Sequence, residues 1–397
     1  MGMSTSLNGT LLSPSRIGDV NRSRVLQAFC DHGPLSRAEL AKMAGVTRAT
    51  IGNITNSLIE AGLIEEHEPR EATGVGKPAT PLWFAPGAGL SAAAAITPGV
   101  FEVALVDARG EVLRHSRGQF DPGAETGAEL RQRLMQAFGR VIGDEADRLL
   151  GIGIAVPGVC DTEGGVIVGS GQVRALRGTA LVESISQRFG RRVLVDNDAR
   201  AQALGEKWFG QGRGAPSFAS IQTGHGLGVG LVLDGVVYRG DRGQTGELGH
   251  TTVVLDGVRC RCGLSGCWET VASLGWLRQE ARRHRLKEAG ALDAGALVAL
   301  AEAGSQAAQG LLDDYADHLA VGLANLVQVL NPPLLILHGD AVAGGERLRR
   351  RIEDGVRSRV LPHLRVGIRV VLSDLDQRAG LLGAAALVLS ETFRLAT

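Results

Sequence analysis

The first eighty-five residues carry apolar positions at helical spacing, which predicts three short helices. The first is expected over residues 16–32, and the second begins at Ser36, where Ser36 and Glu39 form a capping-box signature. Gly45 supplies the next turn, and Thr47 caps a third helix. The apolar face of that helix recurs at i, i+3, i+7 and i+8 and consists of Ile51, Ile54, Leu58 and Ile59. Two short helices joined by a tight turn with glycine are typical of a helix-turn-helix.

The outward face of the third helix is small and polar, which suits the reading of base edges in a major groove. Residues 65–84 then read as a β-hairpin wing whose glycine-rich tip can reach the DNA backbone or minor groove. The candidate DNA-binding residues are Arg48, Thr50, Asn53, Asn56 and, at the wing tip, Lys77. A three-helix module for protein contacts would show the same periodicity, and the hairpin favours DNA binding over that alternative.

Beyond residue 86 the pattern changes to strands that alternate with helices. Strands are expected at 101–107, 112–113, 151–158 (ending in a loop), 192–195, 217–222 and 231–233, and helices over 125–143, 179–189, 199–208 and 377–393. This alternation predicts an α/β architecture whose functional loops lie at the carboxyl ends of the strands.

The charge balance argues against DNA binding through an overall positive charge of the chain. The 397 residues carry 42 Lys plus Arg and 42 Asp plus Glu, so the net charge is zero and no whole-chain positive field exists. Residues 1–64 hold six basic side chains against four acidic ones, a net charge of only +2. This modest charge predicts that two copies of the module bind two half-sites, in a homodimer or a dimer of dimers.

No apolar run approaches the roughly 18 residues of a membrane span, and no signal peptide opens the chain, so we expect a cytoplasmic protein without membrane insertion. The five cysteines are odd in number, which is a poor basis for a disulfide framework. Cys30 reads as core of the DNA-binding module, and Cys160 is a conceivable metal ligand without a nearby partner.

The other three cysteines predict a metal site. Cys260, Cys262 and Cys267 lie within eight residues of one another, and their thiolates can surround one ion. His250, a short loop upstream, is the natural fourth ligand of a tetrahedral zinc site. A site closed by four protein ligands is structural rather than catalytic.

Two further segments lie where strands end. Asp196, Asn197 and Asp198 follow the strand at 192–195, where carboxylates and an amide can bind several hydroxyl groups and one carboxylate can act as a general base. An Asx turn with a helix cap explains these residues equally well. Gly224–Gly230 can present backbone N–H groups to an anion or a sugar, although the strand after it distinguishes it from Rossmann and Walker loops.

The segments Asp196–Glu206, Glu247–His250 and Cys260–Glu269 together resemble the ROK family of repressors, open reading frames and kinases that bind sugars. The resemblance covers nearly the whole chain and implies two actin/hexokinase-like (ribonuclease H-like) α/β lobes around a sugar cleft. The sugar-binding residues that it implies are Asn197, Asp198, Glu247, His250 and Glu269. His250 would ligate zinc and also bind the sugar through its other ring nitrogen.

The same resemblance separates kinase from regulator. Family kinases carry an Asp-x-Gly-Gly-Thr loop for Mg-ATP, and here Ala95, Thr97 and Pro98 replace the aspartate and both glycines. His225 stands where kinases usually have threonine, and Leu337–Asp340 replaces a glycine pair. We therefore expect a repressor that has lost catalysis and assign no catalytic residue. The alternative is an ATP-dependent ROK-type sugar kinase that also binds DNA.

The resemblance also sets the expected domains and partners. Residues 1–85 form the winged helix-turn-helix, residues 86–198 the first lobe, completed by residues 377–397, and residues 199–376 the second lobe with the zinc knuckle. The expected partners are operator DNA and a sugar or sugar-phosphate effector, and a free hexose is no better favoured than a phosphorylated or amino sugar. Activation instead of repression, and a phosphotransfer-system protein as partner, are equally compatible with these residues.

Overall fold

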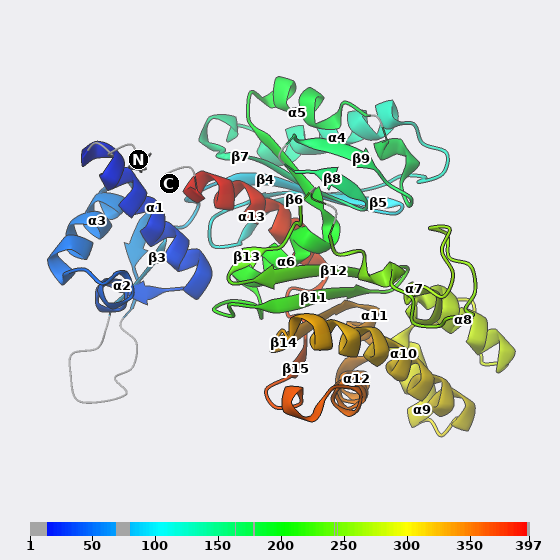
Figure 1. Ribbon diagram of the computed structural model, residues 1–397. Coiled ribbons are helices and arrows are strands. Elements are labelled where there is room, and N and C mark those ends of the chain that lie inside the picture. The colour runs from blue at the N-terminus through cyan, green and yellow to red at the C-terminus, as the bar shows by residue number, and fades with distance from the viewer. Residues whose placement is uncertain are drawn as a thin grey trace, which may run out of the picture. The chain divides into compact units, whose positions relative to one another are not determined.

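The computed structural model describes residues 14–68, 80–162, 164–177, 179–241, 243 and 245–394. The chain divides into two compact units, one of residues 1–88 with 389–397 and the other of residues 89–388 (Figure 1). Within the described part of the chain, no helix combines the length and the apolar character that a membrane crossing requires.

The first unit is a winged helix-turn-helix. Its helices are α1 (Pro14–His32), α2 (Arg37–Ala44) and α3 (Arg48–Glu60), and its sheet has the order β1 (Leu35–Ser36), β3 (Pro81–Phe84) and β2 (Ile64–Glu66). Ser36 and Glu39 make both capping-box hydrogen bonds, and Thr47 caps α3, as predicted. Gly45 ends α2 with φ 64°, a left-handed conformation that glycine adopts without strain.

The core of the first unit is aromatic. Phe29 packs edge-on against Trp83 and Phe84, with ring centroids 6.0 and 5.9 Å apart. Phe393, close to the end of the last helix, stacks on Phe84 with centroids 5.9 Å apart. These rings join the first helix, the wing strand and the last helical residues of the chain in one core.

The second unit has two α/β lobes, each built on a five-stranded sheet. The first sheet has the order β10 (Val193–Asn197), β7 (Gly151–Val156), β4 (Ser91–Thr97), β5 (Val100–Val106) and β6 (Val112–Gln119). Strands β10, β7 and β4 are parallel, and β4, β5 and β6 form an antiparallel meander. One face of the sheet packs on α4 (Gly127–Ile142) and α5 (Leu181–Phe189). A separate ribbon consists of β8 (Val159–Asp161) and β9 (Val166–Gly169).

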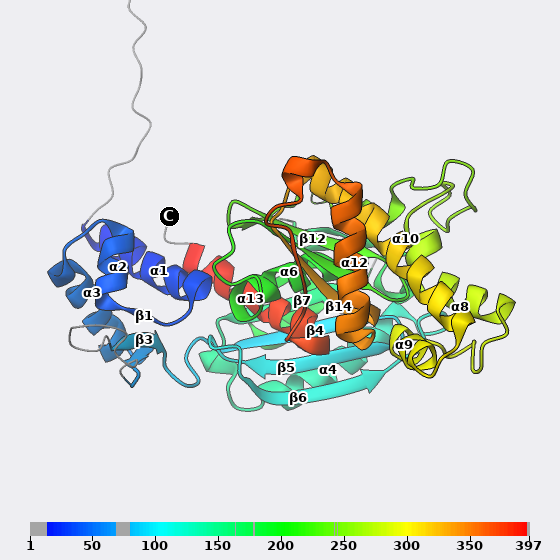
Figure 2. The same cartoon turned by 90° about the horizontal axis from the view of Figure 1, so that it is seen from below.

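The second sheet has the order β13 (Val236–Val237), β12 (Gly228–Leu233), β11 (Phe218–Thr223), β14 (Leu334–Gly339) and β15 (Arg369–Leu372). The helices α10 (Gln306–Leu330) and α12 (Gly345–Arg359) lie side by side over one face of this sheet (Figures 1 and 2). The shorter helices of this lobe are α7 (Glu269–Ala272), α8 (Leu274–Arg283), α9 (Ala294–Glu302) and α11 (Asp340–Ala343). Single 3-10 turns are η1 (Ala146–Arg148), η2 (Arg174–Leu176), η3 (Glu247–His250), η4 (Pro362–Leu364) and η5 (Asp376–Arg378).

Glycines bring α6 (Asp198–Phe209) and α13 (Ala379–Arg394) into backbone contact. A Cβ added at Gly383 would lie 1.7 Å from the Ala201 carbonyl oxygen, and one at Gly205 would lie 2.4 Å from the Ala379 carbonyl oxygen. The two helices can approach so closely only because both positions lack a side chain. This contact fixes α6, whose first turn carries the polar residues of the cleft.

Candidate functional site

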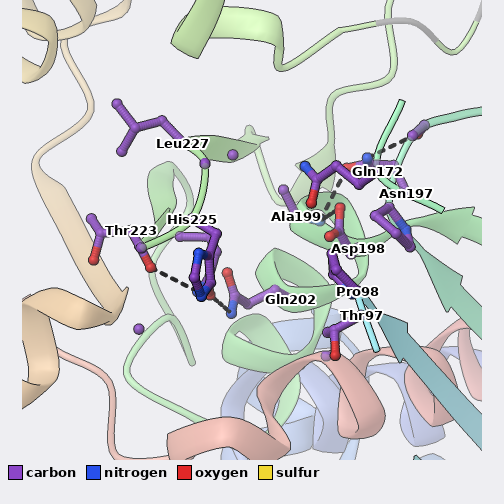
Figure 3. A pocket seen from close by; sticks show the side chains of 18 of the residues that line it. Thr97, Pro98, Gln172, Asn197, Asp198, Ala199, Gln202, Thr223, His225 and Leu227 are labelled. Atoms are coloured by element: carbon purple, nitrogen blue, oxygen red, sulfur yellow. Dashed lines mark hydrogen bonds between the residues drawn. The ribbon is translucent and has the colours of Figure 1, made fainter. Parts of the chain in front are cut away.

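A cavity of about 1200 Å³ lies between the two lobes of the second unit. Its walls come from the β4–β5 turn, the ends of β7 and β10, the start of α6, the β11–β12 turn and the region between residues 245 and 269. All five residues that the resemblance assigns to a sugar site line this one cavity: Asn197, Asp198, Glu247, His250 and Glu269. Figure 3 shows Asn197 and Asp198 on one side of the view and Thr223 with His225 on the other.

Asn197 caps α6. Its Oδ1 accepts hydrogen bonds from the backbone N–H groups of Ala199 and Arg200, at 3.0 and 3.2 Å. Its Nδ2 donates to the carbonyl oxygen of Gly158 at 2.9 Å. The helix-cap interpretation therefore holds for this residue. The second N–H of its amide is the group that can still donate a hydrogen bond to a ligand.

Asp198 differs from its neighbour because its carboxylate lines the cavity. Its Oδ1 accepts a hydrogen bond from the N–H of Ala199 at 2.9 Å. Desolvation raises the pKa of Asp198 to about 6, although this hydrogen bond acts to lower it. The nearby negative charge of Glu247 raises the pKa further. A carboxylate with such a pKa can accept a hydrogen bond, or a proton, from a ligand hydroxyl.

Asp196 holds the polar segment in place. Its carboxylate is fully buried and forms ion pairs with Arg200 at 2.6 Å and Arg239 at 2.8 Å. It also accepts a hydrogen bond from Thr162 Oγ1 at 3.1 Å. Two guanidinium groups on one buried carboxylate join the end of β10 to the loops around it, which fixes the start of α6.

The ligand atoms of the predicted zinc site come together. Those of His250, Cys260, Cys262 and Cys267 all lie within 4.8 Å of one another. His250 Nδ1 is 3.6 Å from Cys260 Sγ, and Cys262 Sγ is 3.6 Å from Cys267 Sγ. Tetrahedral zinc with Zn–S bonds of about 2.3 Å would place its ligand atoms about 3.8 Å apart. This set of three thiols and one imidazole therefore fits a zinc ion.

Trp268 anchors this knuckle, residues 250–267, to the second lobe. Its indole is fully buried, and Nε1 donates to the carbonyl oxygen of His318 at 2.7 Å. A Cβ added at Gly322 of α10 would lie 2.2 Å from the indole, so the ring rests directly on the helix backbone. Trp268 stands between Cys267 and Glu269 in the sequence, so a candidate metal ligand and a candidate sugar ligand share this anchor.

The knuckle also orients Glu269 and His250. Both oxygens of Glu269 accept hydrogen bonds from Arg261, through Nε and Nη2, each at 3.1 Å. Glu269 is only 7% exposed, so this paired geometry is held inside the protein. His250 turns Nδ1 toward the thiols and Nε2 toward Glu247 Oε2, which lies 3.8 Å away. One imidazole therefore faces both the metal site and the cavity wall.

The glycine-rich segment divides into a turn and a strand. Gly224–Leu227 forms the turn at the cavity, whereas Gly228 and Gly230 belong to β12. A Cβ added at Gly230 would lie 2.2 Å from the carbonyl oxygen of Ala199, so this glycine lets β12 approach α6. Of the four glycines expected to present N–H groups to a ligand, Gly224, Gly226 and Gly228 line the cavity, whereas Gly230 serves packing.

The predicted nucleotide side of the cavity has no glycine-rich loop at residues 95–99. Thr97 ends β4 and pairs with Val100 across the tight turn at Pro98 and Gly99. Ala95 and Pro98 line the cavity, so an apolar surface faces the space where an Asp-x-Gly-Gly-Thr loop would bind Mg-ATP.

The β11 and β14 ends complete that side. Thr223 Oγ1 donates to the carbonyl oxygen of His338 at 2.6 Å and accepts from the N–H of Ala341 at 2.8 Å. Asp340 adds a carboxylate to the cavity wall and is held there by Tyr315 Oη at 2.8 Å. This arrangement brings the Asp340 carboxylate to the cavity wall, where the charge of Arg278 acts on it.

The candidate DNA-binding surface is the outer face of α3. The described candidates are all exposed: Arg48, Thr50, Asn53 and Asn56. Arg37 donates hydrogen bonds to Thr55 Oγ1 at 3.1 Å and Asn56 Oδ1 at 3.2 Å, and pairs with Glu66 at 2.5 Å. Arg37 therefore connects α2, α3 and β2 and orients Asn56. Lys77 lies outside the described residues.

Sequence reasoning missed four residues of these sites: Arg37, Gln202, Gln222 and Arg261. Gln202 follows Asp198 by four residues, and that helical spacing could have placed it on the same face. Arg261 lies between two candidate zinc ligands, but nothing local indicates that its side chain pairs with Glu269. The partners of Arg37 and Gln222 are brought near only by the fold.

Known proteins match both parts of the chain. Residues 96–391 match the model of the ROK family, and residues 19–72 match that of the MarR family. A putative xylose repressor from Caldicellulosiruptor sp. is 29% identical, over 94% of this chain and 96% of its own length. A glucokinase from Thermotoga maritima is 33% identical, over 72% of this chain and 93% of its own length. A solved ROK family transcriptional regulator, a homologue of the E. coli MLC protein, has a TM-score of 0.77 at 30% identity and covers 95% of this chain and 97% of its own.

Proposed function

We propose that this chain, which belongs to the ROK family, is a transcriptional regulator that binds operator DNA and responds to a sugar. The winged helix-turn-helix binds the DNA, and the two-lobed unit binds the effector. Relatives that match nearly the full length of the chain are named repressors, and we assign the same action here: the sugar releases the protein from its operator.

One observation carries this proposal, the contrast between the two sides of the cavity. Asp198, His250 and Glu269 bring polar atoms to one side, and fixed partners orient them. On the other side, Ala95 and Pro98 stand in place of a phosphate loop. A site that binds hydroxyl groups and lacks a phosphate cradle is suited to sensing a sugar, not to phosphorylating it.

We assign His250, Cys260, Cys262 and Cys267 to a structural zinc ion. When bound, the ion cross-links the knuckle and contributes to folding rather than to a reaction. Its consequence for the sugar site is positional. Glu269 and His250 are attached to the knuckle, so their geometry depends on it.

Repression requires the cavity to communicate with the DNA-binding unit. We propose a population shift in which the sugar prefers one arrangement of the two lobes, and that arrangement moves the paired helix-turn-helix modules out of the half-site spacing. Two copies of the chain are needed for this, since one module with a net charge of +2 over residues 1–64 has few phosphate contacts.

The experiment is a thermal-shift screen of sugars and sugar phosphates on the wild type and on Asp198→Ala. A sugar that stabilises the wild type and leaves the variant unchanged is the effector. The operator is found by selection from random DNA with the purified chain, and the effector is then added to the complex. Release of the DNA supports the proposal, whereas a DNA affinity that no stabilising sugar alters contradicts it.

The second candidate, a sugar kinase that also binds DNA, is favoured by the similarity to a named glucokinase. The same screen decides it when ATP, magnesium and the effector are combined. If a sugar phosphate forms at a turnover rate typical of kinases, about 1–100 s⁻¹, the protein is an enzyme, and the proposal of a regulator without catalysis is wrong.

A further inference from the structure

Two of the glutamines that line the cavity form a hydrogen-bonded pair. Gln202 Nε2, on α6, donates to Gln222 Oε1, on β11, at 2.8 Å, and Gln222 Nε2 donates to the carbonyl oxygen of Thr223 at 3.0 Å. Gln202 is only 8% exposed, and its Oε1 has no hydrogen-bond partner among the residues that the structure describes. A buried amide oxygen is costly when it lacks a donor, so this atom is suited to a donor that a ligand brings.

The position of Gln202 on α6 relates it to the sugar-binding residues. Gln202 follows Asp198 by four residues, so the two side chains share one face of the helix, with their Cβ atoms about 5–6 Å apart. In Figure 3 Gln202 points from α6 toward the turn that carries Thr223 and His225. When a sugar ring is bound at Asp198, Gln202 is therefore placed to bind a second group that is attached to that ring.

The charges around the cavity select a neutral ligand. Among the residues that the structure describes, six carboxylates line it, those of Glu102, Asp198, Glu247, Glu269, Asp293 and Asp340. Three guanidinium groups of the described lining oppose them, those of Arg117, Arg261 and Arg278. Arg261 is already paired with Glu269, and the described lining residues include no lysine. A phosphate group would meet an excess of negative charge here, whereas hydroxyl groups find acceptors.

The volume of the cavity also exceeds what one sugar ring fills. It measures about 1200 Å³, above the roughly 300–1,000 Å³ of typical small-molecule pockets. The space extends from the knuckle past Gln202 to Gly339 and Asp340 on the other side.

We propose that the effector is an uncharged disaccharide or longer glycoside, with one ring at Asp198 and the knuckle and the next ring beside Gln202 and Gln222. A hydroxyl of the second ring donates a hydrogen bond to Gln202 Oε1. The half of the cleft without a phosphate loop thus forms a second sugar subsite. This inference rests on the proposed function, because it names the class of sugar that the regulator senses.

Calorimetric titration of the full chain tests it with matched pairs, D-xylose against xylobiose and D-glucose against cellobiose, and with glucose 6-phosphate. We expect at least one disaccharide to bind about tenfold or more tightly than its own monosaccharide, and more tightly than the sugar phosphate. In Gln202→Ala this ratio should fall below about threefold. Gln202→Met, which keeps the side-chain length without the acceptor, should behave in the same way if the alanine variant does not fold.

Gln187→Ala, at an exposed glutamine of α5, is the matched control and should keep the wild-type ratio. A monosaccharide or glucose 6-phosphate that binds more tightly than both disaccharides overturns the second subsite while the proposed function stands. A preference for the disaccharide that survives in both Gln202 variants also overturns it. If no sugar binds, and Asp198→Ala behaves as the wild type, the proposed function fails and this inference fails with it.

Discussion

The two sides of the cavity differ in how their polar groups are held. On the knuckle side, Glu269 is locked by Arg261, and Asp198 extends from a helix whose start is fixed by Asp196. On the opposite side, Pro98 lies in the β4–β5 turn, and the hydroxyl of Thr223 donates its hydrogen bond to the backbone carbonyl of His338. The comparison shows one side whose polar groups are held by fixed partners and another side where Ala95 and Pro98 line the cavity.

Loss of the metal should have the largest effect. Cys267→Ser, or a chelator, should reduce the zinc content from about one ion per chain to none and lower Tm by at least about 5 °C. The response to the effector should disappear as well, because Glu269 and His250 depend on the knuckle. Metal analysis and thermal unfolding measure both effects.

Cys160→Ala is the control for this change, because Cys160 is buried in the first lobe outside the four-ligand group. It should keep its zinc. A fully folded Cys267→Ser protein that still binds the effector would show that the knuckle side does not need its cross-link.

The next largest effect is expected at Asp198. Asp198→Asn keeps the shape of the side chain and its bond to the N–H of Ala199 but removes the charge. Hydrogen bonds to charged groups are worth about 1.5–3 kcal/mol, so effector affinity should fall by about 10- to 100-fold in titration calorimetry. Glu183→Gln, at an exposed carboxylate on α5, should leave the affinity as it is. Equal losses in both variants would contradict the role of Asp198.

The same substitution should stabilise the protein without effector. Burial raises the pKa of Asp198 from 3.8 to about 6, so the folded state holds this proton more tightly than the unfolded state does. Ionisation therefore costs stability as the pH rises from about 4 to about 6, and the cost persists above that range. Asp198→Asn should gain on the order of 1 kcal/mol at pH 7 and little at pH 4. Urea unfolding at both pH values measures the difference, and a gain that is the same at both excludes this explanation.

The smallest effects are expected on the side without a phosphate loop. Mg-ATP at millimolar concentration should shift Tm by less than about 1 °C, because the carboxylates of the described lining outnumber its guanidinium groups and repel the phosphates. Pro98→Gly should change effector affinity by less than about twofold, unlike Asp198→Asn. A large stabilisation by ATP would remove the asymmetry between the two sides.

What the sequence could predict was set by local interactions. The capping box of Ser36 and Glu39 and the cysteines of the knuckle lie within a few residues of each other, so spacing alone predicts them. Other contacts join elements that are separate in the sequence, and no local pattern predicts them. Examples are the pairs of Arg37 with Glu66 and of Gln202 with Gln222.

The helices of the second lobe show a different limit. None of the helices from α7 to α12 has a counterpart in the sequence-based prediction, and α10 is the longest of them. Its buried residues, from Ala308 to Val327, lie on several sides of the helix, so the amphipathic pattern that reveals α3 is weak there. Gly230 of the 224–230 segment was misassigned for a related reason, since its packing role depends on its contact with α6.

Trp268 has a practical consequence for spectroscopy. Its indole is buried against the backbone of Gly322 and donates to His318, one residue from the candidate ligand Cys267 and one from Glu269. A metal ion at Cys267 or a ligand at Glu269 would bind next to this residue, and indole emission responds to its surroundings. In a variant with Trp83, Trp208 and Trp276 replaced by phenylalanine, the emission of Trp268 alone should therefore report metal loading and effector binding.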